Sequence, residues 1–263
     1  MKKSFLIPVV QVWVVALFLS TGCSTVPETG RHQWIWGSQS EEMQLGFSEF
    51  EKMKKTIPIS QDTRANEMVR RVGQRIAAVA QLPNAQWEFV VFDSPEANAF
   101  CLPGGKVGVY TGILPICRDD SGLATVIGHE VSHAAARHGG ERMTEAMGIQ
   151  ALGTAANAVV GNSKYAQYAP LFQQVYGIGS QLGVALPHSR KQESEADHIG
   201  LLYMARAGYN PEAAVDFWKR FADYNRQHGG TTPWYLRTHP TDEDRVAALQ
   251  KELPTAKAQF RSP

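Results

Sequence analysis

The chain has 263 residues, of which 43% are hydrophobic and 19% are charged, a composition typical of a globular protein with one large domain or two small ones. Its 26 Lys and Arg residues against 25 Asp and Glu residues give a net charge of +1. This balance, in a sequence without a basic run, argues against nucleic acid or a strongly acidic molecule as the partner.

The N-terminus resembles a targeting segment, because two lysines precede an apolar run that ends shortly before Cys23. Residues 1–22 are similar to a bacterial lipoprotein signal peptide, which would leave a lipidated Cys23 as the mature N-terminus. Ser20 stands where such signals usually have Leu, so an uncleaved anchor and a soluble secreted form stay open. Ser24, in place of Asp, favours the outer membrane. We therefore expect a periplasmic protein of a Gram-negative bacterium, held at the outer membrane by its lipid.

The rest of the chain divides by composition. Residues 23–40 contain Pro, Gly and Ser without periodicity and predict a tether. The folded domain is expected over residues 41–255, followed by a tail at 256–263. An oxidising compartment would permit a disulfide between Cys101 and Cys117, although either could instead be a small buried thiol.

The domain begins with two amphipathic helices, near residues 41–53 and 68–79, where apolar side chains recur at helical spacing. Aromatic and β-branched residues then predict three short strands at 87–92, 97–102 and 106–110. If one of these strands is an edge, its free backbone groups offer a template on which an extended peptide can pair.

The motif that carries the chemistry is GHEVSH, at residues 128–133. On a helix, His129 and His133 lie on one face about a turn apart and can hold a single metal ion. Glu130 lies between them. This H-E-x-x-H pattern is typical of zinc metalloproteases, in which the Glu is the general base.

The surroundings of the motif predict a buried helix. Polar residues at 119–121 can cap its N-terminus, and Gly139 and Gly140 can end it. Apolar side chains cover a broad arc between these ends, so the motif would be shielded from water. A buried Glu130 then needs a metal, a proton or a paired cation, and zinc with a bound water would satisfy it.

A third metal ligand is expected downstream, because catalytic zinc usually takes three protein ligands and a water. The run ESEAD at residues 193–197 opens another helix, and Glu193 and Asp197 share one of its faces. Glu193 could reach the metal while Asp197 accepts a hydrogen bond from a ligand histidine. Glu195 points to another side of the helix and is the weaker alternative as the ligand.

Two further segments could contribute to the site. Residues 143–186 are either ordinary core helices or a mobile cover over the cleft. His239 lies on a loop close in sequence to Arg245, where it could stabilise an oxyanion or have no role. Thr241 resembles the cap of a last helix.

Four motifs in chain order resemble metallopeptidase family 48, the group that contains the CaaX prenyl proteases and the bacterial heat-shock membrane proteases. They are NAFCLPGGKVGVYTGIL from Asn98, GHEVSH from Gly128, ESEAD from Glu193 and THPTDEDR from Thr238. The resemblance covers roughly residues 41–253 and is greatest to the periplasmic lipoprotein branch without membrane-spanning helices. It implies a mostly helical α+β, zincin-like fold of the gluzincin type, with a small β-sheet packed beside the motif helix.

The resemblance also implies a metal centre. His129, His133 and Glu193 match the ligands of one Zn²⁺ per chain. Glu130 matches the general base that acts on the attacking water. These assignments imply a zinc metalloendopeptidase.

The remaining matches surround that centre. Asp197 matches a carboxylate that supports a ligand histidine. Arg245 matches a basic residue that supports His239. His239 itself matches a histidine that stabilises the transition state or occupies the position of the water in a closed form. Asn98 and Ala99 match the edge strand that binds the substrate.

We therefore expect an endopeptidase that hydrolyses misfolded or unassembled envelope proteins as part of protein quality control. The main alternative is a zinc-stabilised, chaperone-like lipoprotein that binds unfolded proteins without cleaving them. A structural lipoprotein without metal is a second alternative. Glu130 favours the enzyme, because a purely structural zinc site does not require a general base.

Overall fold

The computed structural model describes residues 22–154, 171, 175, 188–227, 235, 239 and 245–261. Over these residues it is a mostly helical α+β protein with a three-stranded sheet and a separate two-stranded hairpin, so the predicted fold class is confirmed. The elements in chain order are β1 (Cys23–Thr25), β2 (His32–Trp34), α2 (Gln39–Thr56), α3 (Thr63–Ala77), β3 (Glu88–Phe92), β4 (Ala99–Leu102), β5 (Lys106–Tyr110), η1 (Thr111–Ile113), α4 (Leu114–Cys117), α5 (Asp120–Ala135), α6 (His138–Thr154), α8 (Arg190–Arg206), α9 (Glu212–Gln227) and α11 (Arg245–Lys257).

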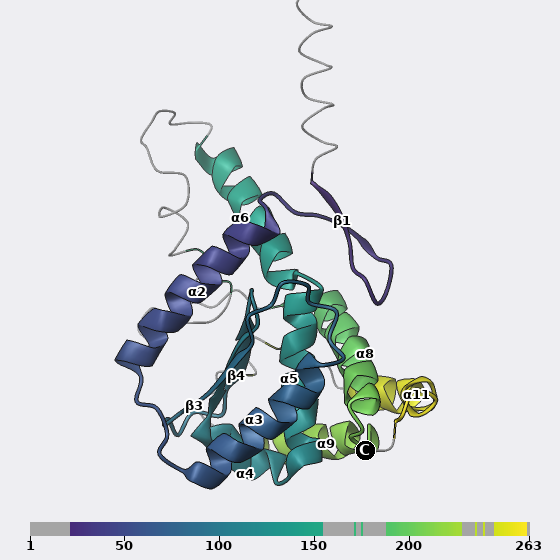
Figure 1. Ribbon diagram of the computed structural model, residues 1–263. Helices are drawn as coiled ribbons and strands as arrows, with labels where there is room; N and C mark the ends of the chain where they lie inside the picture. The colour runs from purple at the N-terminus through teal and green to yellow at the C-terminus, as the bar shows by residue number, and fades with distance from the viewer. Residues whose placement is uncertain are drawn as a thin grey trace, which may run out of the picture.

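The motif helix α5 lies at the centre of the domain (Figure 1). It packs against α8 on one side, against β4 on another, and against α3 and α9. Every residue from Gly122 to Ala135 is buried, and the Asp119 side chain caps the helix by accepting a hydrogen bond from the Gly122 backbone N–H at 2.9 Å. The burial predicted from the apolar arc therefore matches the packing, and the motif lies inside the core.

The end of α5 differs from the prediction. The helix stops at Ala135, Arg137 adopts a left-handed φ of 54°, and α6 begins at His138, so Gly139 and Gly140 lie inside α6. Gly140 does not end a helix but leaves room for the Glu42 side chain, because a Cβ on it would lie 2.5 Å from a Glu42 carboxylate oxygen. The left-handed residue Arg137 therefore separates α5 from α6.

The three predicted strands form one sheet in the order β3-β5-β4. β3 pairs with β5 in parallel, and β4 pairs with β5 antiparallel, with Ala99 opposite Val109. Within the described residues β4 has a strand neighbour on one side only, so it is an edge strand, and it lies against α5. Cys101 on β4 and Cys117 on α4 are both buried, free thiols, and no disulfide joins them.

Residues 23–40 are not an unstructured tether. β1 and β2 form an antiparallel hairpin that packs on the helical body through buried Val26 and Ile35. The Gln33 side chain donates a hydrogen bond to the Ala136 carbonyl at 2.8 Å, at the C-terminal end of α5. Three-residue strands with few apolar side chains carry no readable alternation, which explains the difference. Cys23 is exposed at the start of β1, and its lipidation stays a prediction.

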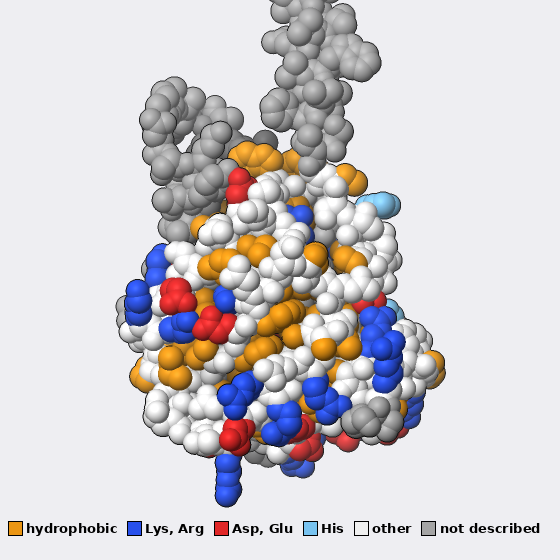
Figure 2. All heavy atoms as spheres, viewed as in Figure 1, with side chains coloured by type: hydrophobic (Ala, Val, Ile, Leu, Met, Phe, Trp, Pro, Cys, Tyr) orange, Lys and Arg blue, Asp and Glu red, His pale blue; other side chains and the backbone are white. Residues whose placement is uncertain are grey.

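The surface carries charges of both signs. On the face shown in Figure 2, acidic and basic side chains lie intermixed over the lower part of the molecule, as expected from a net charge of +1. Among the described helices, none combines the length and the apolar character needed to cross a bilayer. The predicted signal segment (residues 1–22) and most of the predicted cover (residues 143–186) lie outside the described residues.

Candidate metal centre and active site

A close crossing of α5 and α8 builds the site. A Cβ on Gly200 would lie 3.1 Å from the backbone nitrogen of His129, and a Cβ on Gly128 would lie 3.1 Å from the Gly200 carbonyl oxygen. A Cβ at either position would press on the opposite backbone, so glycine at both positions lets the two helices approach closely. Glu193 lies seven residues, or about two helical turns, before Gly200 on α8. The crossing therefore brings Glu193 beside the motif.

The first turn of α8 is fixed by a capping box. The Ser189 hydroxyl accepts a hydrogen bond from the Gln192 backbone N–H at 3.2 Å, and the Gln192 side chain accepts one from the Ser189 N–H at 3.1 Å. This reciprocal cap satisfies backbone donors that the helix leaves unpaired. Glu193 follows directly, so its side chain leaves a well-ordered helical turn.

Four donor atoms converge between these helices. The Nε2 atoms of His129 and His133 are 3.0 Å apart, and the Glu193 carboxylate oxygens lie 3.5 Å from the first and 3.3 Å from the second. His239 Nδ1 lies 3.0 Å from Glu193 and 3.3 Å from His129 Nε2. Donors about 2.0–2.1 Å from a tetrahedral zinc ion are themselves separated by about 3.3 Å. The four groups therefore fit one zinc ion.

The electrostatics of this cluster favour a cation. His129, His133, Glu193 and His239 are each at most 5% exposed. Burial opposes ionisation of Glu193, but His239 and His129 nevertheless hold the pKa of Glu193 well below its usual range. Burial likewise opposes protonation of His129, yet hydrogen bonds to Asp197 and Glu193 raise its pKa to about 9. Positive charge is thus stabilised between these carboxylates, and a metal ion would supply it.

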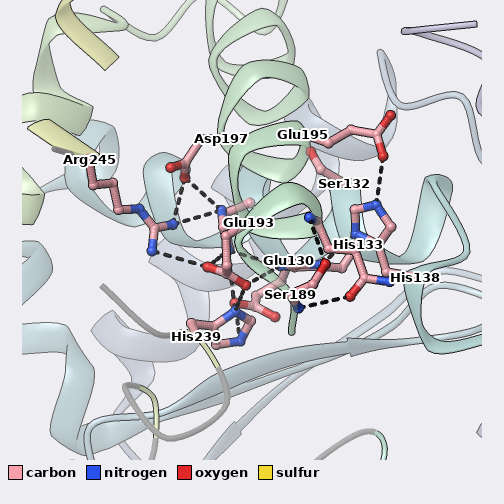
Figure 3. Close-up of polar contacts among 12 residues, drawn as sticks. Glu130, Ser132, His133, His138, Ser189, Glu193, Glu195, Asp197, His239 and Arg245 are labelled. Carbon is pink, nitrogen blue, oxygen red and sulfur yellow. Dashed lines mark hydrogen bonds and ion pairs between the residues drawn. The ribbon is translucent and has the colours of Figure 1, made fainter. Parts of the chain in front are cut away.

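Asp197 and Arg245 support one side of the cluster (Figure 3). Asp197 Oδ1 lies 3.0 Å from His129 Nδ1 and accepts a hydrogen bond from Arg245 Nη2 at 2.6 Å. Arg245 Nη1 donates to Glu193 at 3.1 Å, and its guanidinium lies 3.4 Å from the centre of the Trp218 ring. The structure thus brings both predicted residues to the ligands, and their roles stay predictions.

Glu130 lies beside the cluster with an unsatisfied oxygen. Its carboxylate is buried, and Oε1 has no hydrogen-bond partner among the described residues; His239 Nε2 lies 3.5 Å from this oxygen. A small cavity opens there, lined in part by Glu130, His133, Asn98 and Ala99. A buried carboxylate oxygen aimed at an empty space needs a partner that occupies that space. The predicted edge-strand residues line the same cavity.

The sequence reasoning missed two histidines of this site. The His188 ring stacks on His133, with centroids 3.8 Å apart, and burial holds the pKa of His188 well below its usual range. His138 Nδ1 lies 2.8 Å from His133 Nδ1. His138 follows the motif by five residues, and it is the first residue of α6, after the left-handed residue Arg137.

Glu195, the weaker ligand alternative, lies away from the four donors. Its Oε2 is 2.9 Å from His138 Nε2. Although burial opposes ionisation, hydrogen bonds from His138, Thr29 and Arg31 lower the pKa of Glu195 to about 2. The geometry therefore favours Glu193 over Glu195 as the third donor.

Comparison with known proteins agrees with the site. The family described as Peptidase family M48 matches residues 63–253. The mitochondrial metalloendopeptidase OMA1 of Schizosaccharomyces pombe is 37% identical over 188 residues, 72% of this chain and 53% of that protein. The protein of that name in Saccharomyces cerevisiae is 31% identical over 260 residues, 92% of this chain and 72% of that protein. The β-barrel assembly-enhancing protease of Escherichia coli is 27% identical over 248 residues, 92% of this chain and 50% of that protein.

These relatives correct the predicted location. Relatives from two yeasts, from Arabidopsis thaliana and from Danio rerio carry mitochondrial names, so the prediction of a periplasmic protein at the outer membrane is wrong. An apolar N-terminal segment is typical of targeting sequences, but its composition does not specify the compartment.

The comparisons bear out the expected family and the expected class of enzyme. The chain spans about half the length of the S. pombe and E. coli relatives. The prediction of a metallopeptidase enzyme is confirmed by the family match and by relatives named as metalloendopeptidases. The chain belongs to peptidase family M48.

Proposed function

We propose that this chain is a zinc-dependent endopeptidase that cleaves misfolded or unassembled proteins. The observation that supports the proposal most is the set of four buried donors at tetrahedral spacing, with the unpartnered Glu130 oxygen beside them. Relatives named as a metalloendopeptidase and as a β-barrel assembly-enhancing protease agree with it. The expected restriction to envelope proteins depended on the predicted location, which is wrong.

His129, His133 and Glu193 would hold the zinc ion. When bound, zinc would polarise the scissile carbonyl and lower the pKa of a water molecule to about 7. Glu130 would accept the proton of the attacking water and deliver it to the leaving amine, which the free side of its carboxylate permits. Asp197 would fix the His129 ring by accepting the hydrogen bond of Nδ1, leaving Nε2 for the metal.

His239 would have two positions. In the structure its Nδ1 lies at the fourth corner of the donor set, where the water is needed for hydrolysis. Turnover therefore requires the His239 ring to leave that corner. From a neighbouring position it could stabilise the negative charge that develops on the carbonyl oxygen. This arrangement corresponds to the closed form that the family resemblance implies.

The substrate would lie along β4. An edge strand can accept an extended peptide through backbone hydrogen bonds, without regard to side-chain sequence. Asn98 and Ala99 line the cavity beside Glu130, so a peptide paired there would pass the metal centre. Backbone pairing requires an unfolded segment, which favours misfolded or unassembled proteins as substrates.

Glu130→Gln tests the proposal, because Gln keeps the size of the side chain but cannot accept the proton. We expect the variant to bind zinc like the wild type and to lose cleavage of an unfolded substrate such as casein. Wild-type protein treated with a chelator provides the metal-free control. Retained cleavage by the variant would contradict the mechanism. Binding of casein without cleavage by the zinc-loaded wild type would instead favour the chaperone-like alternative.

A further inference from the structure

The two motif histidines are supported in different ways. His129 Nδ1 lies 3.0 Å from Asp197, a direct contact to a carboxylate. Among the described residues no carboxylate contacts Nδ1 of His133, which instead faces His138 Nδ1 at 2.8 Å. His138 Nε2 in turn lies 2.9 Å from Glu195 (Figure 3). A second imidazole thus stands between His133 and the carboxylate.

The contact between the two Nδ1 atoms fixes the protons of both rings. Of two ring nitrogens at 2.8 Å, one must donate and the other accept. If His133 is to bind a metal through Nε2, its proton is on Nδ1 and is donated to His138. His138 then carries its proton on Nε2, where Glu195 accepts it. The chain of hydrogen bonds has one consistent direction, ending on a carboxylate.

The N-terminal hairpin binds Glu195, the carboxylate at the end of this series of hydrogen bonds. Arg31 Nε donates to Glu195 Oε2 at 2.7 Å, and the Thr29 hydroxyl donates to the other oxygen. Arg31 also binds both oxygens of Glu141, at 2.8 and 3.1 Å. The Arg31 side chain is only 13% exposed, so these bonds are largely shielded from water. Glu195 therefore has a fixed position set by a segment more than 160 residues earlier.

The two sides of the metal centre are thereby alike. On one side, α8 provides Asp197, and Arg245 neutralises it at 2.6 Å. On the other, α8 provides Glu195, and Arg31 neutralises it at 2.7 Å. Each carboxylate is a partner of one motif histidine, directly or through His138. Groups that orient a ligand histidine in this way raise the metal affinity of a site.

We propose that His138, Glu195 and Arg31 are positioning residues for His133, and that the N-terminal hairpin is in this way a working part of the metal centre. The inference rests on the proposed function in one respect, namely that His133 binds zinc through Nε2. It gives the hairpin a role in metal binding beyond that of packing.

Zinc affinity, measured by competition with a chromophoric chelator, tests the inference. His138→Phe removes the acceptor, and we expect it to weaken zinc binding by about 10- to 100-fold. His138→Asn keeps an acceptor near the position of Nδ1, and we expect it to recover most of that loss. Arg31→Gln should weaken zinc binding about tenfold, because Glu195 loses its cation. With an oligopeptide substrate these losses should appear in kcat rather than in KM.

Arg206→Gln is the matched control. Arg206 on α8 also ties the hairpin down, by donating to Glu28 at 2.6 and 3.1 Å, and its side chain is 19% exposed. Unlike Arg31, it is bonded to none of the site histidines or their carboxylates. We expect Arg206→Gln to bind zinc within threefold of wild type. Thermal unfolding of each metal-free variant checks that it is folded.

The outcomes separate this inference from the proposed function. Equal effects of Arg31→Gln and Arg206→Gln on zinc affinity would reduce the role of Arg31 to hairpin packing and overturn the inference. Wild-type affinity in His138→Phe would do the same. If His138→Phe does not fold, His138→Asn and Arg31→Gln decide. A wild-type protein that binds no zinc at these histidines would overturn the proposed function, and the inference with it.

Discussion

Replacing Gly200 by Ala tests whether the close crossing of α5 and α8 sets the metal geometry. The added Cβ would lie 3.1 Å from the His129 nitrogen and 3.2 Å from the Gly128 carbonyl carbon, whereas ordinary contacts begin at 3.4 Å. All the nearest atoms are backbone, so no side chain can rotate away. The helices must therefore separate by about 0.3 Å or more at this point.

The size of the effect follows from two opposing terms. Overpacking of this kind costs about 1–3 kcal/mol, while Ala is better than Gly in a helix by about 1 kcal/mol. The net loss in the free energy of unfolding should be up to about 2 kcal/mol. The helix separation of about 0.3 Å also exceeds the tolerance of about 0.2 Å in metal–ligand distances, so zinc affinity should fall about tenfold.

Urea unfolding of the metal-free protein and chelator competition for zinc measure the two effects separately. Ser194→Ala, on the exposed side of α8, is the control, and its stability should change by less than about 0.5 kcal/mol. If Gly200→Ala matches the wild type in both stability and zinc affinity, the crossing does not position Glu193, and this account of the site is incorrect.

Three further predictions concern single groups. Asp197→Asn should weaken zinc binding by about 10- to 100-fold in the same competition assay, because His129 loses its charged partner; unchanged affinity would contradict that role. Burial opposes the ionisation of Glu141, but Arg31 and Gln192 lower its pKa below 4.5, so its stabilising contribution is present above pH 4.5 and fades as the pH falls through the lowered value. The stability difference between wild type and Glu141→Gln in urea should therefore shrink from pH 7 toward pH 3, and a difference that grows would contradict it. Chelation should lower the melting temperature of the wild type, since a ligand at 100 times its Kd adds about 2.7 kcal/mol, but not that of a variant that has lost zinc binding.

Local spacing predicted which donor groups come together at the candidate metal centre. His129 and His133 are four residues apart on one buried helix, and Glu193 and Asp197 repeat that spacing on another, so each pair could be placed on one face from the sequence. The choice of Glu193 over Glu195 also followed from helical geometry. The periodicity of the strands similarly predicted the sheet, whereas the edge strand that begins at Ala99 was expected only from the family resemblance.

The features of the site that the sequence did not predict depend on contacts between distant segments. His138 follows the motif helix, but the break between α5 and α6 at the left-handed residue Arg137 has no sequence signal of its own. Arg31 lies in a stretch that resembles a linker, because its hairpin gains order from α5, α6 and α8 rather than from its own pattern. The fine position of the His239 ring, likewise, comes from packing in the folded protein.

X-ray absorption at the zinc K-edge, on protein loaded with one equivalent of zinc, tests the central claim most directly. We expect only nitrogen and oxygen ligands at about 2.0–2.1 Å, with the multiple scattering of at least two imidazoles, and loss of one oxygen ligand in Glu193→Ala. A sulfur ligand at about 2.3 Å, or a spectrum unchanged in Glu193→Ala, would contradict a site built from His129, His133 and Glu193.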